Sequence, residues 1–383
     1  MGSIMKRAPV REILWLFLLT RLLPVIVTYF GYILLTAAQY SSAPVDATFF
    51  STWNHWDAAN YVRIAQYGYT PPYDFAFFPL FPLLISIIAH ILGSWSYQAV
   101  GMILSNMALL GTMLLLYQLA VESAGEEVAR RTLLYLCIFP TAFYFFAAYN
   151  ESLFLLFTTA TFLALRRRRW WLAGLLGCCA ALTRSAGILL VLPYLYELWV
   201  AREHITLSIR IFLRSAFSIT LIPLGTACYA LYCWHMTSNP LIFVAVQAHW
   251  HRHLSWPWQG LWNGLFELFW NQPFGSASQA HILLDLSATL CFILLTVLGW
   301  RKLRTSYTIW AGTLLLYILL SPATELHDWL MSNQRFVLEM FPAFITLASL
   351  SSTHPTLHKA LLLIFPTLFA TLSLIFVMNR WLV

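Results

Sequence analysis

Long apolar runs separated by short polar stretches make up most of this chain. They lie at Ile13 to Ala38 and near 97–120, 132–148, 151–165, 170–187, 187–200, 207–234, 281–300, 306–321, 336–351 and 360–378. A helix needs about 20 mostly apolar residues to cross a bilayer, so the pattern predicts about 11 transmembrane helices. We therefore expect an all-α polytopic membrane protein, with one membrane-embedded domain over residues 1–383.

One shorter apolar segment, Phe77 to Leu92, contains Pro79 and Pro82 and is too short for a full span. We expect a helix that lies in the membrane interface or dips into it. Charge supports this assignment. With the N-terminus inside, the basic run Arg166 to Arg169 then falls on the cytoplasmic side, whereas one more span would place it outside, against the positive-inside rule.

Composition agrees with a membrane protein. The chain is 60% hydrophobic and 10% charged, with a mean hydropathy of +0.71, whereas soluble domains carry about 25% charged residues. Because Lys and Arg collect in cytoplasmic loops, the net charge of +7 does not indicate nucleic-acid binding. The six cysteines sit in apolar runs without a C-x-x-C pair, so neither a disulfide framework nor a zinc site is expected.

Two long loops are predicted on the outer side, the first external loop 39–96 and the loop 235–280. Tryptophans gather in them: Trp53, Trp56, Trp95, Trp250, Trp256, Trp258, Trp262 and Trp270. An interfacial aromatic belt explains most of these residues. A platform for a sugar or a lipid headgroup is the alternative.

The first external loop holds the densest group of ionisable residues, with Asp57 as the sharpest candidate. A helix over residues 53–66 would place Asp57 on one face with Trp53, Tyr61 and Ile64, and no Lys or Arg lies one turn away. A carboxylate in such surroundings suits a general base that takes a proton from a hydroxyl. A helix N-cap or a hydrogen-bonded loop carboxylate remains an equal alternative.

Arginines on the outer side are the exception in this topology. They are Arg63, Arg184, Arg252, Arg335 and Arg380. Guanidinium groups at a membrane surface suit a phosphate, whose oxygens accept paired hydrogen bonds. Headgroup snorkelling is the alternative, and it is favoured for Arg380, next to the C-terminus. Arg184 and Arg335 lie at the ends of apolar helices, and this setting favours a functional site.

Glu151 and a group of histidines complete the candidates. Glu151 begins an apolar run on the same side as Asp57, so it either caps a helix or belongs to the site. His249 and His253 have the i, i+4 spacing of zinc ligands, but no carboxylate or cysteine follows at a useful spacing. We favour contacts to a phosphate or sugar, or loop solvation, and expect no metal and no cofactor.

Several motifs resemble one known family. The run W-D-x-x-x-Y-x-x-I-A-x-x-G-Y from Trp56 to Tyr69, followed by F-F-P-L-F-P, resembles the first external loop of the PIG-V family. This family comprises the GPI mannosyltransferase 2 enzymes and shorter prokaryotic homologues. Weaker blocks follow in the family's order at Phe139 to Phe154, Leu182 to Gly187, Gln247 to Trp258 and Gln334 to Pro342.

The resemblance implies a GT-C glycosyltransferase fold with juxtamembrane helices in the first external loop. It implies a polyprenyl-phosphate mannose donor, such as dolichol-phosphate mannose, inversion at the sugar carbon, and Asp57 as base. The acceptor is expected to be a lipid or glycan hydroxyl at the non-cytoplasmic face. We expect Arg184, Arg252, Arg335 and Arg63 to bind the donor phosphate, and further substrate contacts from His55, Trp56, Asn60, Tyr61, Glu151, Gln247, His249 and His327.

Two other functions are considered. A lipid or glycan transporter or flippase predicts inverted repeats and ionisable groups near the bilayer midplane. No repeat is visible, and Arg21 and Arg214 are the charges we place within spans. A non-catalytic scaffold would not need Asp57. The compact length favours a prokaryotic homologue in the plasma membrane; a eukaryotic one would lie in the endoplasmic reticulum.

Overall fold

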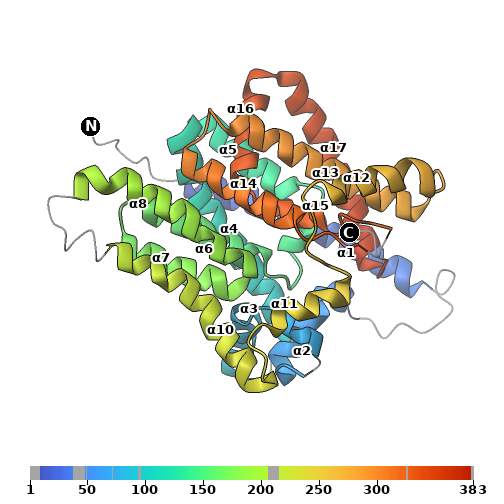
Figure 1. Ribbon diagram of the computed structural model, residues 1–383. Helices are drawn as coiled ribbons and strands as arrows, with labels where there is room; N and C mark the ends of the chain where they lie inside the picture. The colour runs from blue at the N-terminus through green and yellow to red at the C-terminus, as the bar shows by residue number, and fades with distance from the viewer. Residues whose placement is uncertain are drawn as a thin grey trace.

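The computed structural model describes residues 9–37, 48, 50–70, 72–93, 96–205, 215–324 and 327–380. Apart from a single bridge between Arg252 and Ala323, these residues form helices and turns. The α-helices (Figure 1) are α1 Val10–Thr36, α2 Asp57–Tyr67, α3 Leu80–Ile91, α4 Tyr97–Ala124, α5 Glu126–Ile138, α6 Glu151–Arg166, α7 Trp170–Thr183, α8 Val191–Ile205, α10 Leu221–Thr237, α11 Ile242–Ala245, α12 Gln259–Phe266, α13 Ala277–Gly299, α14 Thr305–Leu319, α15 Asn333–Phe336, α16 Phe341–Thr353 and α17 Pro355–Val377.

The all-α membrane fold predicted from the apolar runs is confirmed. Where the structure describes them, the predicted runs are helical, and several are broken into two or more helices. Among the described residues, five helices are long and apolar enough to cross a membrane, or six if Asn333–Glu339 and Phe341–Thr353, bent by 85°, form one broken span. Some runs are divided by proline. The residue before a proline avoids the helical conformation. Phe139, which precedes Pro140, has a ψ of 145°, and α5 therefore ends at Ile138.

Small residues let the central helices approach closely. A Cβ atom on Gly225 of α10 would lie 2.6 Å from the carbonyl oxygen of Cys178 on α7. A Cβ atom on Gly177 of α7 would lie 2.7 Å from the Ile222 side chain. Small residues at helix contacts are typical of membrane bundles, in which packing rather than water exclusion drives association.

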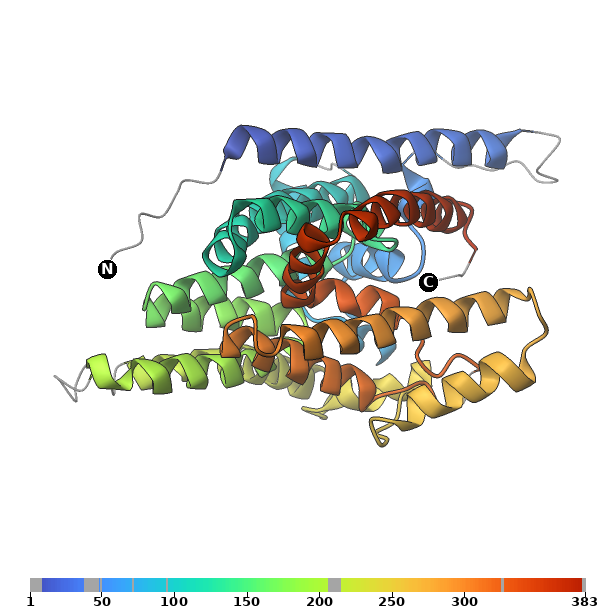
Figure 2. The same cartoon turned by 90° about the horizontal axis from the view of Figure 1, so that it is seen from above.

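Helix α1 lies at one edge of the bundle, next to α17 (Figure 2). Its Arg21 is buried and donates from Nη2 to the carbonyl oxygen of Cys137 at 3.3 Å, in the last turn of α5. A cation there complements the negative end of the helix dipole. Arg21 is therefore a structural residue, while Arg214 lies outside the described residues.

The helix directions define two ends of the bundle. Helix α6 runs from Glu151 to Arg166 over 16 residues, about 24 Å, and α7 returns to Arg184. Glu151 and Arg184 thus share one end, and the run Arg166 to Arg169 lies at the other. The short helices α2, α3 and α11 gather at the first end (Figure 1), and the short helix predicted at 77–92 is confirmed as Leu80–Ile91.

The helix predicted over 53–66 is wrong at its start. Trp56 has a positive φ of 54°, so α2 begins only at Asp57. Trp53 belongs to a separate 3-10 turn, Ser51–Trp53, and is fully buried, with its Nε1 donating to Thr28 at 2.8 Å. Trp53 is therefore a core residue rather than part of an interfacial belt.

The other outer-loop tryptophans divide between surface and pocket. Trp256, Trp258, Trp262 and Trp270 are highly exposed, as lipid-facing or headgroup-facing rings of an aromatic belt should be. Trp250 packs edge-on against Phe77. Trp95 lies outside the described residues.

Candidate active site

Asp57 is the first residue of α2, at the end of the bundle where Glu151 lies. A carboxylate is favoured there because the first turn of a helix carries the positive end of its dipole. The Asp57 side chain is 22% exposed, and its Oδ2 accepts a hydrogen bond from Arg335 Nη1 at 2.7 Å. One turn later, Tyr61 is buried against Phe77 and Phe81.

Arg335 connects Asp57 to a chain of buried charges. Its Nε lies 3.3 Å from Glu151 Oε1, and the same oxygen accepts from Arg184 Nη1 at 2.9 Å. Arg184 Nη1 is also 2.6 Å from Glu339 Oε1. Three carboxylates and two guanidinium groups therefore alternate, and when all are ionised this five-residue charge chain carries a net charge of −1.

Aromatic rings hold Arg335 in place. Its guanidinium carbon lies 5.4 Å and 5.5 Å from the ring centroids of Tyr144 and Tyr149, and 5.1 Å from that of Phe336. The two tyrosines come from the segment between α5 and α6, where Thr141 Oγ1 also donates to the Gln334 carbonyl at 2.7 Å. Cation–π contacts and packing thus restrict the guanidinium to one position facing Asp57.

Arg252 differs from the other two site arginines. It comes from the loop after α11, and its guanidinium donates to backbone carbonyls only, Ser321 at 2.9 Å and Met331 at 2.6 Å. In the described part of the chain it forms no ion pair with a carboxylate. Burial, with a contribution from the Arg335 charge, lowers the pKa of Arg252 to about 10, so it is still a cation at neutral pH.

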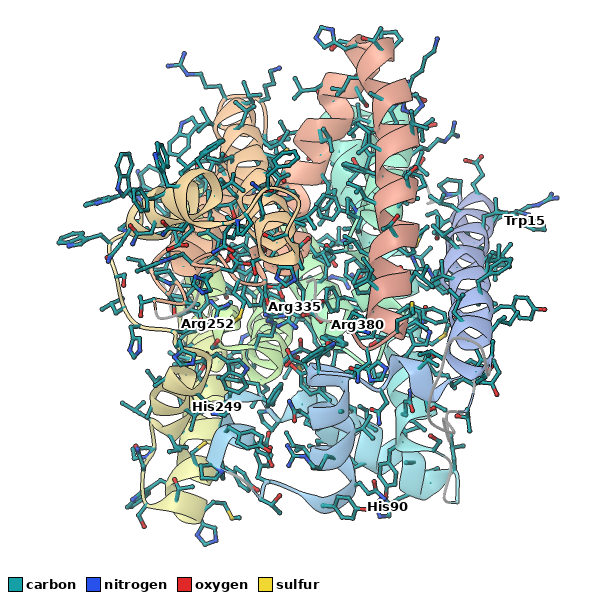
Figure 3. All side chains as sticks on the ribbon, turned by 90° about the vertical axis from the view of Figure 1, so that its right-hand side faces the viewer. Trp15, His90, His249, Arg252, Arg335 and Arg380 are labelled. Atoms are coloured by element: carbon teal, nitrogen blue, oxygen red, sulfur yellow. The ribbon has the colours of Figure 1, made fainter. Side chains whose placement is uncertain are left out.

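These groups line one pocket, whose empty volume is about 1100 Å³ including the solvent at its mouth. Figure 3 shows Arg335 and Arg252 near the centre of the molecule, with Trp15 and His90 at the periphery. The polar lining includes Asp57, Tyr61, Arg184, Gln247, Arg252 and Arg335, and the apolar lining includes Phe77, Trp250, Leu314, Ile318 and Phe336. Two carboxylates, Asp57 and Glu339, line the pocket with three arginines. Such a lining suits an anionic ligand that also presents a hydroxyl.

Glu151 does not line the pocket but pairs with two arginines that do. It is also the first residue of α6, whose N-cap Asn150 forms no side-chain cap hydrogen bond. A role for Glu151 in the site stays a prediction. Gln247 and Tyr61 line the pocket, and their predicted contacts to the substrate stay predictions.

Arg63 and Asn60 lie outside the pocket lining. Arg63 Nη1 donates to Asp74 Oδ2 at 2.8 Å, and Nη2 donates to Asn60 Oδ1 at 3.0 Å. Hydrogen bonding to the buried Asp74 raises the pKa of Arg63. Arg63 therefore links α2 to the turn Pro72–Ala76. Its guanidinium already donates hydrogen bonds to Asp74 and Asn60.

His55 and Trp56 precede α2 and also lie outside the pocket lining. The His55 ring is 6.0 Å from that of Phe376 on α17, and burial lowers its pKa. Trp56 is a partly exposed residue at the positive-φ position that starts α2.

The histidines of the later loops lie apart from the pocket as well. His249 is exposed and stacks on Tyr73 at 5.1 Å, and His327 is exposed too. His251 has a φ of 55°, which ends the 3-10 turn, so His249 and His253 do not share a helix face. Among the described residues no three metal-ligating side chains come together.

Two buried carboxylates close to the site arginines were missed by the sequence analysis. Glu339 ends the charge chain, and Asp285, 1% exposed, lies two turns into α13. The statement that Arg21 and Arg214 are the charges within spans is therefore wrong. A carboxylate inside a predicted span is a site candidate by default, and that signal was present at both positions.

Comparison with known proteins identifies a family. The sequence model described as "Mannosyltransferase (PIG-V)" matches residues 13–251, more than half of the chain. GPI mannosyltransferase 2 of Schizosaccharomyces pombe is 25% identical over 236 residues, covering 55% of this chain and 49% of that protein. GPI alpha-1,6-mannosyltransferase 2 of Mus musculus is 34% identical over 146 residues, covering 35% of this chain and 29% of that protein. The chain thus matches half or less of these relatives' length.

Among solved structures, ArnT from Cupriavidus metallidurans bound to undecaprenyl phosphate superposes with a TM-score of 0.52 at 12% identity. The match covers 90% of this chain and 62% of that one. At this identity the likeness concerns the fold alone, and it agrees with the GT-C fold expected from the sequence.

Proposed function

Since the chain belongs to the PIG-V mannosyltransferase family, we propose that it moves a mannosyl group from a polyprenyl-phosphate donor to a hydroxyl of a lipid or glycan. The pocket carries this proposal, because it combines the Asp57 carboxylate with the Arg252 cation, which pairs with no carboxylate among the described residues. A glycosyl transfer from a lipid phosphate needs both groups. One takes a proton from the acceptor, and the other stabilises the phosphate that leaves.

The chemical step uses Asp57 as general base. The acceptor oxygen attacks the anomeric carbon as its proton passes to the Asp57 carboxylate. The bond between that carbon and the phosphate oxygen breaks, the pair of electrons stays on the phosphate, and the sugar carbon is inverted. Arg335 Nη1 lies 2.7 Å from Asp57 Oδ2 and holds the carboxylate in position.

Arg252 is the best candidate for the donor phosphate. Arg184 and Arg335 are already neutralised by buried carboxylates, whereas Arg252 has only carbonyl partners among the described residues. A phosphate beside Arg252 would gain a charge-assisted contact without breaking an ion pair. The undecaprenyl phosphate in the ArnT structure supports a lipid phosphate at this fold's site. The apolar side chains of Leu314 and Ile318 offer a surface for the lipid tail.

The sidedness follows from the charge distribution. Arg166 to Arg169 lie at the end of the bundle opposite the pocket. Since basic loops remain in the cytoplasm, the pocket faces the non-cytoplasmic side. This location gives the enzyme access to a lipid-linked donor in the outer leaflet.

The test is a transfer assay with the purified chain in lipid nanodiscs. Radiolabelled polyprenyl-phosphate mannose is supplied with lipid and glycan acceptors. We expect labelled acceptor and free polyprenyl phosphate in equal amounts. A transporter or flippase would instead move the intact donor across a liposome bilayer without releasing polyprenyl phosphate, and that result would contradict the proposal.

A further inference from the structure

A second group of buried carboxyl groups lies behind Arg335. Asp285 of α13 is 1% exposed and accepts hydrogen bonds from two backbone amides, Ser332 at 3.3 Å and Gln334 at 2.8 Å. These amides belong to the first turn of α15, the four-residue helix that carries Arg335. Asp285 therefore fixes the backbone from which the guanidinium of Arg335 extends.

The backbone of this turn is in a costly conformation, so hydrogen bonds from α13 are needed to hold it. Ser332 has a φ of 67°, a left-handed conformation that is costly for a residue with a side chain. Asn333 Nδ2 donates to Thr289 Oγ1 on α13 at 3.1 Å, one turn beyond Asp285. Helix α13 thus holds three consecutive residues of the turn, two through Asp285 and one through Thr289.

Asp328 is a second buried carboxyl group close to Asp285. It comes from the loop before α15, its Oδ1 accepts from the Leu330 amide at 3.1 Å, and its Oδ2 is buried without an N–H donor. The buried Asp285 and Asp328 carboxyl groups lie close enough to interact electrostatically. His281 Nδ1 lies 3.9 Å from Asp328 Oδ2. An amide at position 285 would add an N–H donor beside the buried Asp328 carboxyl group.

We propose that Asp285 is a positioning residue which, through the first turn of α15, sets the location of Arg335 and so of the Asp57 carboxylate. This inference rests on the proposed function, because it assigns Asp285 a role in the same reaction. Asp285 touches neither substrate nor Asp57. Its effect should therefore appear in turnover rather than in donor binding, which we assign to Arg252.

The experiment compares three variants of the full chain in nanodiscs. Asp285→Ala removes both acceptors, so we expect kcat to fall by about 30-fold or more while the donor KM stays within about threefold. Asp285→Asn keeps an oxygen for the Gln334 amide and gives Asp328 an N–H donor, so we expect kcat within about fivefold of wild type. Thr296→Val removes a buried hydroxyl elsewhere on α13 and should change neither constant.

Hydrogen–deuterium exchange of residues 330–340 tests the positioning without substrate. We expect faster exchange in Asp285→Ala and wild-type exchange in Thr296→Val. If Asp285→Ala does not fold, Asp285→Ser replaces it, because serine is too short to reach both amides.

An Asp285→Ala enzyme with kcat near wild type, a loss confined to the donor KM, or unchanged exchange would overturn the inference. If the wild-type chain transfers no sugar, the proposed function fails instead, and the exchange measurement still decides the role of Asp285.

Discussion

The two ends of the bundle both carry arginine–carboxylate pairs, but the pairs differ in burial. At the pocket end, the Arg184 and Glu339 side chains are 17% and 2% exposed. At the opposite end, Arg130 and Glu12 form a pair at 3.1 Å whose side chains are 49% and 58% exposed. The residue types and distances are similar, so water access is the main difference between them.

This difference decides what each end can do. Water screens the exposed pair and can replace either partner, so such pairs contribute little to stability. A buried pair cannot lose one partner cheaply, because the remaining charge has no water to solvate it. The pocket end can therefore keep charged groups in fixed positions, whereas the charges at the opposite end are screened by water.

The largest expected effect is on stability at the pocket end. Arg184→Met leaves Glu339 buried without its ion partner at 2.6 Å, and we expect the free energy of unfolding to fall by about 3–5 kcal/mol. Thermal or denaturant unfolding in detergent measures it. The double variant Arg184→Met with Glu339→Gln should recover part of the loss, since a neutral amide needs no cation. No recovery would mean that packing, not charge, causes the loss.

The second-largest expected effect is on the affinity for the donor, in the variant Arg252→Ala. Arg252→Ala removes the cation that we assign to the donor phosphate and leaves no carboxylate unpaired. We expect donor affinity to fall by roughly 10- to 100-fold, the value of a hydrogen bond to a charged group, with stability changed less than in Arg184→Met. Equilibrium binding of a labelled polyprenyl phosphate measures this. Unchanged affinity would move the phosphate site to another arginine.

The smallest effect belongs to the exposed end. Arg130→Met breaks the pair with Glu12, and we expect the free energy of unfolding to change by no more than about 1 kcal/mol, with wild-type transfer activity. The substitution matches Arg184→Met, so the two measurements compare burial directly. Equal losses at both ends would contradict the distinction drawn between them.

The fold was largely predictable from the sequence, because hydropathy alone decides which segments enter a bilayer. The position of α2 was less so, since the positive φ of Trp56 cannot be seen in a hydrophobic pattern. The site was partly predictable. Arg184 and Arg335 stood out as cations on the side of the membrane where cations are rare, and the structure brings both to the pocket.

The failures have a common physical cause. Arg63 looked uncommitted because its partner Asp74 lies 11 residues away across a turn, beyond the reach of helical spacing rules. Asp285 was not singled out from the sequence, because the backbone amides that donate to it lie 47 and 49 residues away. Local patterns show which residues are unusual, but tertiary contacts decide whether their charges are already used.

The most direct test of the account is Asp57→Asn. Asparagine has nearly the same shape and can still accept from Arg335, but it cannot take a proton from the acceptor. Donor binding and single-turnover transfer should be measured on the same preparation. We expect binding within about threefold of wild type and transfer slower by about 10²–10⁴-fold, the contribution of a general base. Wild-type transfer by Asp57→Asn would contradict the account, as would a loss explained by donor binding alone.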